Sequence, residues 1–132
     1  MKVLVDTHCL LWLVDESSHT RIPPPALAAV VDPTNDLLIS AITPWELSLK
    51  YWLGKLPEAF ALLAAWEDTV KRLRATVLSL TGDHGIVAGQ LDWAHKDPFD
   101  RMIAAQAVIE NAALISADTV FDSVSGMRRI WN

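Results

Sequence analysis

The stretch "HKDPFDRMIAAQAVIENAALISAD", residues 95–118, predicts a helix followed directly by a strand. Apolar residues recur at helical spacing over residues 98–112, and Ala104 and Ala107 are small enough to let this helix pack closely on a sheet. The next apolar run, residues 113–116, is continuous rather than alternating, which is typical of a strand buried on both faces. A closely packed helix beside a fully buried strand indicates the α/β class.

The same alternation of strand and helix patterns continues along the chain. Further short strands are predicted at residues 3–5, 37–40, 76–80 and 128–132. Helices are predicted over residues 44–53 and, as one helix or two, over residues 59–74. Strands that alternate with helices in one domain form a parallel sheet wrapped by helices. We therefore predict a single domain, residues 1–132, with a parallel sheet of four to five strands.

Two tryptophans mark the expected inner face of the helix over residues 44–53. Trp45, Leu49 and Trp52 share one apolar stripe at helical spacing. We expect Trp45 and Trp52 to pack inside.

Composition bounds the class of protein. Of the 132 residues, 52% are hydrophobic and 20% are charged, which excludes a disordered chain. Asp6 and His8 interrupt the apolar N-terminal run, so a signal peptide is not expected, and no uncharged apolar run is long enough for a membrane span. Cys9 is the only cysteine, so no intramolecular disulfide is possible, which fits the cytoplasm.

The net charge of -5 argues against tight, non-specific binding of duplex nucleic acid. It does not exclude a nucleic-acid enzyme whose acids gather at a metal site, because bound cations would offset that charge.

Acidic residues follow the predicted strands or begin the predicted helices. Asp6 and Asp118 follow strands, Glu46 lies in the first turn of a helix, and Asp97 and Asp100 begin the helix over residues 98–112. In a parallel sheet, strand C-termini and the helix N-termini that follow them lie on one edge, where ligands bind. These carboxylates are therefore predicted to face one crevice.

Several of these acids also have structural interpretations. Glu46 forms a capping box with Thr43 and an i,i+4 pair with Lys50. Asp97 suits a helix cap, Asp100 suits the positive end of the helix dipole, and Asp118 suits a cap for "DTVFD". Asp6 is the hardest to explain structurally, because a buried, unpaired carboxylate at the end of an apolar strand is costly.

Convergence of the acids favours a metal site over these structural interpretations. Carboxylates brought together repel one another unless a cation joins them. Oxygen ligands without cysteine or paired histidine suit Mg²⁺ or Mn²⁺ rather than zinc. Such a site is suited to metal-assisted phosphodiester hydrolysis. Arg101, beside Asp100, is either a phosphate contact or a solvated or ion-paired residue.

Four motifs together resemble the PIN-domain ribonucleases, and most closely the toxin half of VapBC-type toxin–antitoxin pairs. They are "VLVDTHCLLW", "ISAITPWELSLKYWLGKL", "HKDPFDRMIAAQA" and "LISADTVFD". The resemblance implies a three-layer α/β/α sandwich and Mg²⁺- or Mn²⁺-dependent endonucleolytic cleavage of RNA. It also implies a VapB-type antitoxin partner, a homodimer and a cytoplasmic location.

The family's acidic quartet corresponds to Asp6, Glu46, Asp100 and Asp118 in this sequence. The resemblance implies that Asp6 and Asp100 are the principal metal ligands, with Glu46 and Asp118 completing the shell directly or through water. Ser116 matches the family's hydroxyl residue and is expected to hold Asp6 or Asp118 by a hydrogen bond.

Two other functions remain open at this point. One is a non-catalytic binding module with the same fold, and the other is a metal-dependent phosphatase on a similar sheet. The latter usually has paired acids after the first strand, whereas this chain has Asp-Thr-His there.

Overall fold

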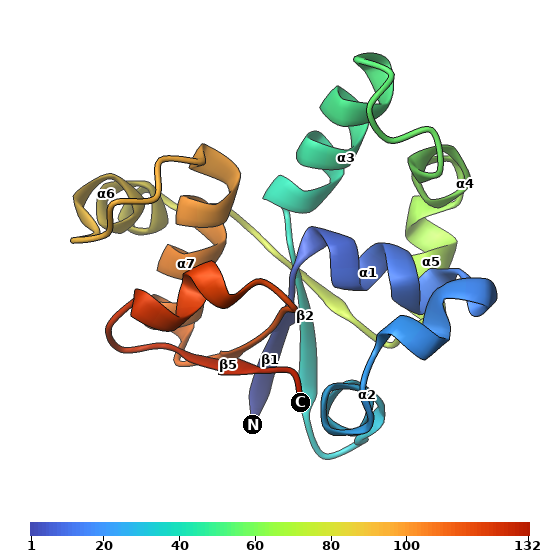
Figure 1. The fold of residues 1–132 in the computed structure, drawn as a ribbon, viewed down its shortest axis with the longest axis horizontal. Coiled ribbons are helices and arrows are strands. Elements are labelled where there is room, and N and C mark those ends of the chain that lie inside the picture. The colour runs from blue at the N-terminus through green and yellow to red at the C-terminus, as the bar shows by residue number, and fades with distance from the viewer.

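Five parallel strands form the sheet at the centre of the computed structural model, which describes residues 1–132 (Figure 1). They are β1 (Lys2–Val5), β2 (Asp36–Ser40), β3 (Thr76–Leu78), β4 (Ala113–Ile115) and β5 (Arg128–Ile130), in the spatial order β3-β2-β1-β4-β5. Leu4 of β1 is in register with Leu38 and Leu114 in the two neighbouring strands. Val3, Leu4 and Val5 are fully buried, so this continuous apolar run is a strand buried on both faces, as predicted, and it lies at the centre of the sheet.

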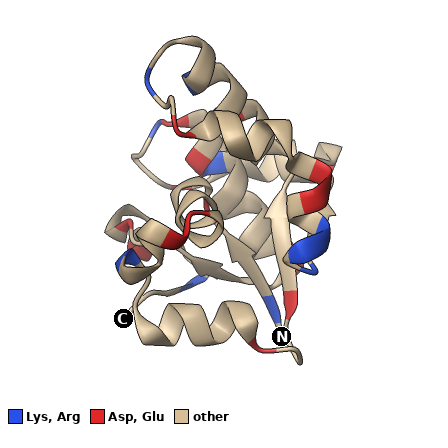
Figure 2. Cartoon of the chain, turned by 90° about the vertical axis from the view of Figure 1, so that its right-hand side faces the viewer, with Lys and Arg blue, Asp and Glu red and all other residues tan.

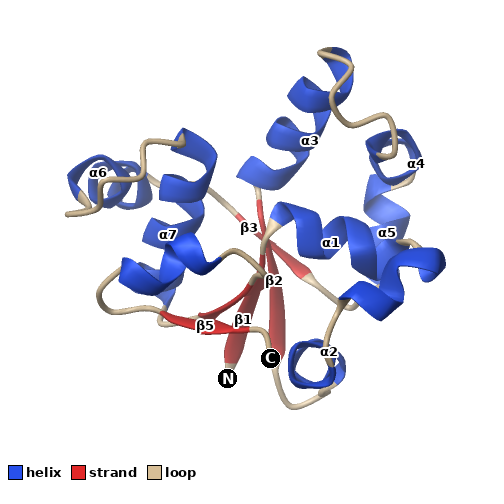
Figure 3. Cartoon of the chain, in the orientation of Figure 1, coloured by secondary structure: helices blue, strands red, loops and turns tan.

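Helices cover both faces of this sheet (Figure 3). They are α1 (Thr7–Val14), η1 (Glu16–Arg21), α2 (Pro24–Val31), α3 (Ile42–Trp52), α4 (Ala59–Ala64), α5 (Trp66–Arg72), α6 (Gly82–Gln90), α7 (Pro98–Glu110) and η2 (Thr119–Ser123). In Figure 1, α6 and α7 lie on one side of the strands, and α1, α2, α4 and α5 lie on the other. The predicted three-layer α/β/α arrangement and the parallel sheet are confirmed. None of the helices has the length and apolar character that a bilayer crossing requires.

Each face of the sheet has its own apolar core. Val3 and Val5 point to the side of α1, where they join Leu10 in the larger core. Leu4 points the other way and joins Ile103 and Ala107 of α7. The small side chains of α7 thus let it lie against the strands, as the sequence predicted.

The predicted inner face of α3 is wrong. Trp45 is 60% exposed and Trp52 is 81% exposed. The buried residues of α3 are Ile42, Thr43, Glu46 and Leu47, one position along from the apolar stripe. Two polar side chains occupy the inner face because the N-terminal half of α3 lies at the edge of the sheet that carries the acids.

Helix α6 is an element that the sequence analysis did not predict. Thr81 caps it by accepting a hydrogen bond from the backbone N–H of His84 at 3.2 Å. His84 Nδ1 in turn accepts from the Thr81 N–H at 3.1 Å. This is a capping box with histidine at the third position in place of the usual glutamate or glutamine, so the sequence pattern was not detected.

Asn111 ends α7 in the left-handed backbone conformation, with φ of 52°. Replacing it with Ala is expected to lower the free energy of unfolding by about 1 kcal/mol, because a Cβ disfavours this region. Gly at the same position should leave stability unchanged or slightly improved. Urea unfolding of both variants measures this difference, and equal losses would contradict it.

Candidate functional site

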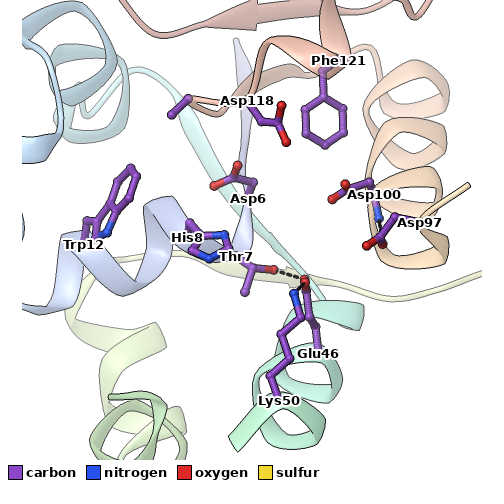
Figure 4. Close-up of a pocket in the computed structure, with 11 residues that line it drawn as sticks. Asp6, Thr7, His8, Trp12, Glu46, Lys50, Asp97, Asp100, Asp118 and Phe121 are labelled. Carbon is purple, nitrogen blue, oxygen red and sulfur yellow. Dashed lines mark hydrogen bonds and ion pairs between the residues drawn. The ribbon is translucent and has the colours of Figure 1, made fainter. Parts of the chain in front are cut away.

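The pocket at the C-terminal edge of the sheet collects the acids from distant parts of the chain. It has a volume of about 420 Å³ and is lined by Asp6, Glu46, Asp97, Asp100 and Asp118, together with six other residues. Figure 4 shows the carboxylates of Asp6, Asp100 and Asp118 around the same space, with Glu46 below them on α3. All four members of the predicted quartet therefore line one pocket.

Asp6 connects the central strand to α1. Its backbone N–H continues the sheet ladder to Ile115 O at 3.1 Å, and its carboxylate caps α1 by accepting from Cys9 N–H at 2.8 Å. Burial raises the pKa of Asp6 above its ordinary value, an effect that Asp100 reinforces and that Ser116 and the Cys9 N–H oppose. Asp6 is thus an acid held at a position that disfavours its charge.

Asp97 and Asp100 occupy the first turn of α7. Asp97 caps the helix, as predicted, by accepting from the N–H groups of Phe99 at 2.9 Å and Asp100 at 3.1 Å. The carboxylate of Asp100 pairs with His95 Nε2 at 2.7 Å. Burial raises the pKa of Asp100, and neighbouring Asp97 and Glu46 add to the rise, while His95 opposes it.

Glu46 has both carboxylate oxygens occupied. Thr7 Oγ1 donates to Oε1 at 2.5 Å, and Lys50 Nζ donates to Oε2 at 2.5 Å. The pair with Lys50 is confirmed, but the predicted capping box is wrong. Helix α3 begins at Ile42 after Ala41, so Thr43 lies inside the helix, and its buried hydroxyl has no hydrogen-bond partner.

Ser116 lies between the two acids that follow β1 and β4. Its Oγ accepts from the Asp118 N–H at 3.0 Å, and its hydroxyl lowers the pKa of Asp6. Asp118 Oδ1 accepts from Val120 N–H at 3.0 Å, so the predicted cap of "DTVFD" is confirmed, as the start of a 3-10 helix. The fully buried Ser116 therefore fixes the backbone of one acid and favours the charge of the other.

Arg101 is not among the residues that line this pocket. Its guanidinium donates to four backbone carbonyls at 2.8–2.9 Å, those of Ala88, Leu91, Trp93 and His95. These contacts join the end of α6 and the following loop to the first turn of α7. The structure therefore places Arg101 as a brace behind His95 and Asp100, in neither an ion pair with Asp97 nor a solvated position.

Oxygen donors and negative charge make the pocket chemically suited to a divalent cation. No group of three or more His, Cys, Asp or Glu residues is close enough, as placed, to enclose a metal ion. Both oxygens of Glu46 and one oxygen of Asp100 are already hydrogen-bonded, to Thr7, Lys50 and His95. The donor set fits such an ion, but the side chains would need to draw together around it.

The PIN domain model matches residues 3–127, nearly the whole length of the chain. The chain belongs to the PIN domain family. No curated protein matched the sequence.

Three solved structures share this PIN fold. A chain of VapBC2 from Rickettsia felis, bound to a promoter DNA fragment, is 18% identical with a TM-score of 0.70, and the match covers 100% of both chains. Chains of DNA-bound VapBC from Salmonella typhimurium and of VapBC-1 from nontypeable Haemophilus influenzae are 22% and 23% identical, both with TM-scores of 0.69. Each of these two matches covers 98% of this chain and 97% of the other. At these identities the likeness shows the fold.

Proposed function

We propose that this PIN-domain protein is a metal-dependent endoribonuclease and the toxin of a VapBC-type toxin–antitoxin module. The observation that carries the proposal is the convergence of Asp6, Glu46, Asp100 and Asp118 on one pocket. These residues come from the ends of two neighbouring strands and the beginnings of two helices, on the edge where α/β folds bind ligands.

In the proposed mechanism, Asp6 and Asp100 hold Mg²⁺, or Mn²⁺ in its place, and Asp118 assists. When bound, the ion supplies an activated water and neutralises charge that develops on the phosphate. Burial raises the pKa values of Asp6 and Asp100, and a bound cation would favour their ionised forms. Ser116 orients both Asp6 and Asp118. The proposed products carry a 5′-phosphate and a 3′-hydroxyl.

The VapBC structures that share the fold support the proposal of an antitoxin partner. We infer a VapB-type antitoxin, a homodimer as the assembled toxin, and a cytoplasmic location. The net charge of -5, and the scattered placement of lysines and arginines among acidic residues in the view of Figure 2, support selective rather than general contact with RNA.

Sequencing of RNA ends after brief expression in a bacterial host tests the proposal directly. New 5′-phosphate ends at defined positions, together with growth arrest relieved by the antitoxin, are expected. Cleavage by the purified protein should require Mg²⁺ or Mn²⁺ and stop when a chelator is added. Folded protein that leaves RNA intact with either metal would instead favour a non-catalytic binding module.

Ser116→Ala is expected to lower RNA cleavage about tenfold, the usual cost of losing a group that orients a metal ligand. The change leaves the Asp118 N–H without its acceptor and removes the hydroxyl that favours the Asp6 carboxylate. A steady-state cleavage assay measures the effect. Ser123→Ala, a matched change on exposed η2, should leave cleavage unchanged, and equal rates for all three proteins would contradict the prediction.

A further inference from the structure

We propose that Lys50 binds a phosphate group of the substrate beside the scissile bond, and that Glu46 positions Lys50 instead of binding the metal directly. This inference rests on the proposed function in taking RNA as the substrate. It assigns different roles to the two charged residues that α3 contributes to the pocket.

Lys50 is the only lysine or arginine that lines the pocket. Five carboxylates share that lining, so an approaching phosphodiester meets a strongly negative surface wherever no cation is bound. Arg101, which directly follows Asp100 in the sequence, has its guanidinium hydrogen-bonded to backbone carbonyls. Lys50 therefore provides the only permanent positive side chain at which the substrate's phosphate can be received.

The ammonium group of Lys50 is held in place and still has free donors. One of its three N–H donors serves Glu46 Oε2 at 2.5 Å, and no other protein acceptor takes the remaining two. The Lys50 side chain is 28% exposed and that of Glu46 only 6%, so the pair presents its positive member to the solvent. Figure 4 shows both side chains rising from α3 to Thr7, at the border of the pocket.

Glu46 has the contacts of a positioning residue. Thr7 occupies one of its oxygens and Lys50 the other, so direct binding of a metal ion would break at least one short hydrogen bond. Thr7 directly follows Asp6, which means that Glu46 connects the start of α1 to Lys50. Its burial keeps this carboxylate out of competition with the phosphate for the solvent side of the ammonium.

An ordinary i,i+4 ion pair on a helix surface is the competing interpretation. The chain contains such a pair for comparison, Asp68 and Arg72 on α5, whose side chains are 65% and 73% exposed. Neither residue lines the acidic pocket. If Lys50 served only to pair with Glu46, its removal would change stability and leave affinity for RNA untouched.

Affinity for a labelled single-stranded RNA, measured by fluorescence anisotropy in Mg²⁺, separates these interpretations. Asp6→Asn is included in every protein so that the RNA stays intact. Because Lys50→Met alone would leave the Glu46 charge buried, the decisive comparison is Glu46→Gln against Glu46→Gln/Lys50→Met. Lys55→Met, at an exposed lysine outside the pocket, is the matched control, and thermal melting verifies that each variant is folded.

Glu46→Gln provides the reference affinity, because Lys50 keeps its charge in this variant. Adding Lys50→Met should weaken binding about tenfold and lower the salt dependence by about 0.7 in logarithmic slope, the value for one lost phosphate contact. Lys55→Met should change neither quantity. Equal affinity with and without Lys50 would overturn the inference.

The proposed nuclease activity is tested separately with the Asp6-containing protein. Cleavage by that protein combined with equal affinities in the comparison above would reject the role of Lys50 and retain the enzyme. The tenfold effect without any cleavage would retain the phosphate site and reject the enzyme.

Discussion

Replacing Asp6 with Asn is expected to lower RNA cleavage by at least about a hundredfold, as for other preorganised groups that stabilise developing charge. The same change should raise the melting temperature of the metal-free protein. Asn keeps an oxygen that can accept the Cys9 N–H, so the cap of α1 is preserved. The gain comes from removing a carboxylate whose ionised form is disfavoured by burial and by Asp100.

The gain in melting temperature of Asp6→Asn should depend on pH, in the direction set by the raised pKa of Asp6. An acid with a raised pKa keeps its proton in the folded state at pH values where the unfolded chain has already lost it. The stability of the unsubstituted protein should therefore fall as the pH rises from the ordinary aspartate range through the raised pKa of Asp6. The advantage of Asp6→Asn is absent at lower pH and complete above that window, where melting should rise by about 4 °C for each kcal/mol recovered.

Asp15→Asn is the matched control, because Asp15 also caps a helix but lies outside the pocket. Its side-chain hydrogen bonds with Ser17 and Ser18 lower its pKa, so the carboxylate form is the favoured one. Asp15→Asn should therefore leave cleavage unchanged and bring no gain in melting temperature. Melting curves in a chelator from about pH 4 to about pH 8 measure both variants. A loss of stability in Asp6→Asn at neutral pH would contradict the argument.

The parts of this fold that the sequence predicted best are those fixed by burial on two sides. The run Val3-Leu4-Val5 can be satisfied only at the centre of a sheet, and the acid after it then lies at the C-terminal edge. Asp118 reaches the same edge because β4 pairs directly with β1. The gathering of acids in one pocket thus follows from strand direction, before any side-chain contact is known.

The rotation of α3 could not be predicted from its apolar residues. Trp45 packs edge-on against Phe99 with ring centroids 5.2 Å apart, while the inner face contains Glu46 bonded to Thr7. A contact between residues 39 positions apart stabilises a buried carboxylate that a hydrophobicity pattern places on the surface. Thr7 becomes a partner of Glu46 only through the position of α1 relative to α3. The face that α3 turns inward depends on that contact.

The role of Arg101 was also hidden from the sequence. Its neighbours in the sequence are acidic or apolar, which suggests a solvated or substrate-facing charge. The four acceptors are main-chain carbonyls, whose availability depends on how the loop after α6 folds back on α7. Backbone acceptors carry no signature in the sequence, so this contact was not predictable.

Arg101→Met is expected to lower the free energy of unfolding by about 3 kcal/mol, because it leaves four half-buried carbonyls without their charged donor. Arg101→Lys should recover little of the loss, since a single ammonium cannot span the positions that the planar guanidinium reaches. Cleavage should fall in both variants, because the His95 carbonyl accepts one of those hydrogen bonds and the His95 ring pairs with Asp100.

Urea unfolding and RNA affinity together distinguish this brace from a phosphate contact. Arg72→Met, at an exposed pair on α5, is the control and should change stability by less than about 0.5 kcal/mol. The brace predicts a large loss of stability in Arg101→Met and Arg101→Lys, with an unchanged salt dependence of RNA binding in the folded protein. A phosphate contact predicts the reverse, with both variants as stable as the unsubstituted protein. The salt dependence of RNA binding would become shallower in Arg101→Met. It would be restored in Arg101→Lys, because lysine supplies the same charge. The geometry supports the brace, since four of the five guanidinium N–H groups already donate to carbonyl oxygens and Arg101 is not among the residues that line the pocket.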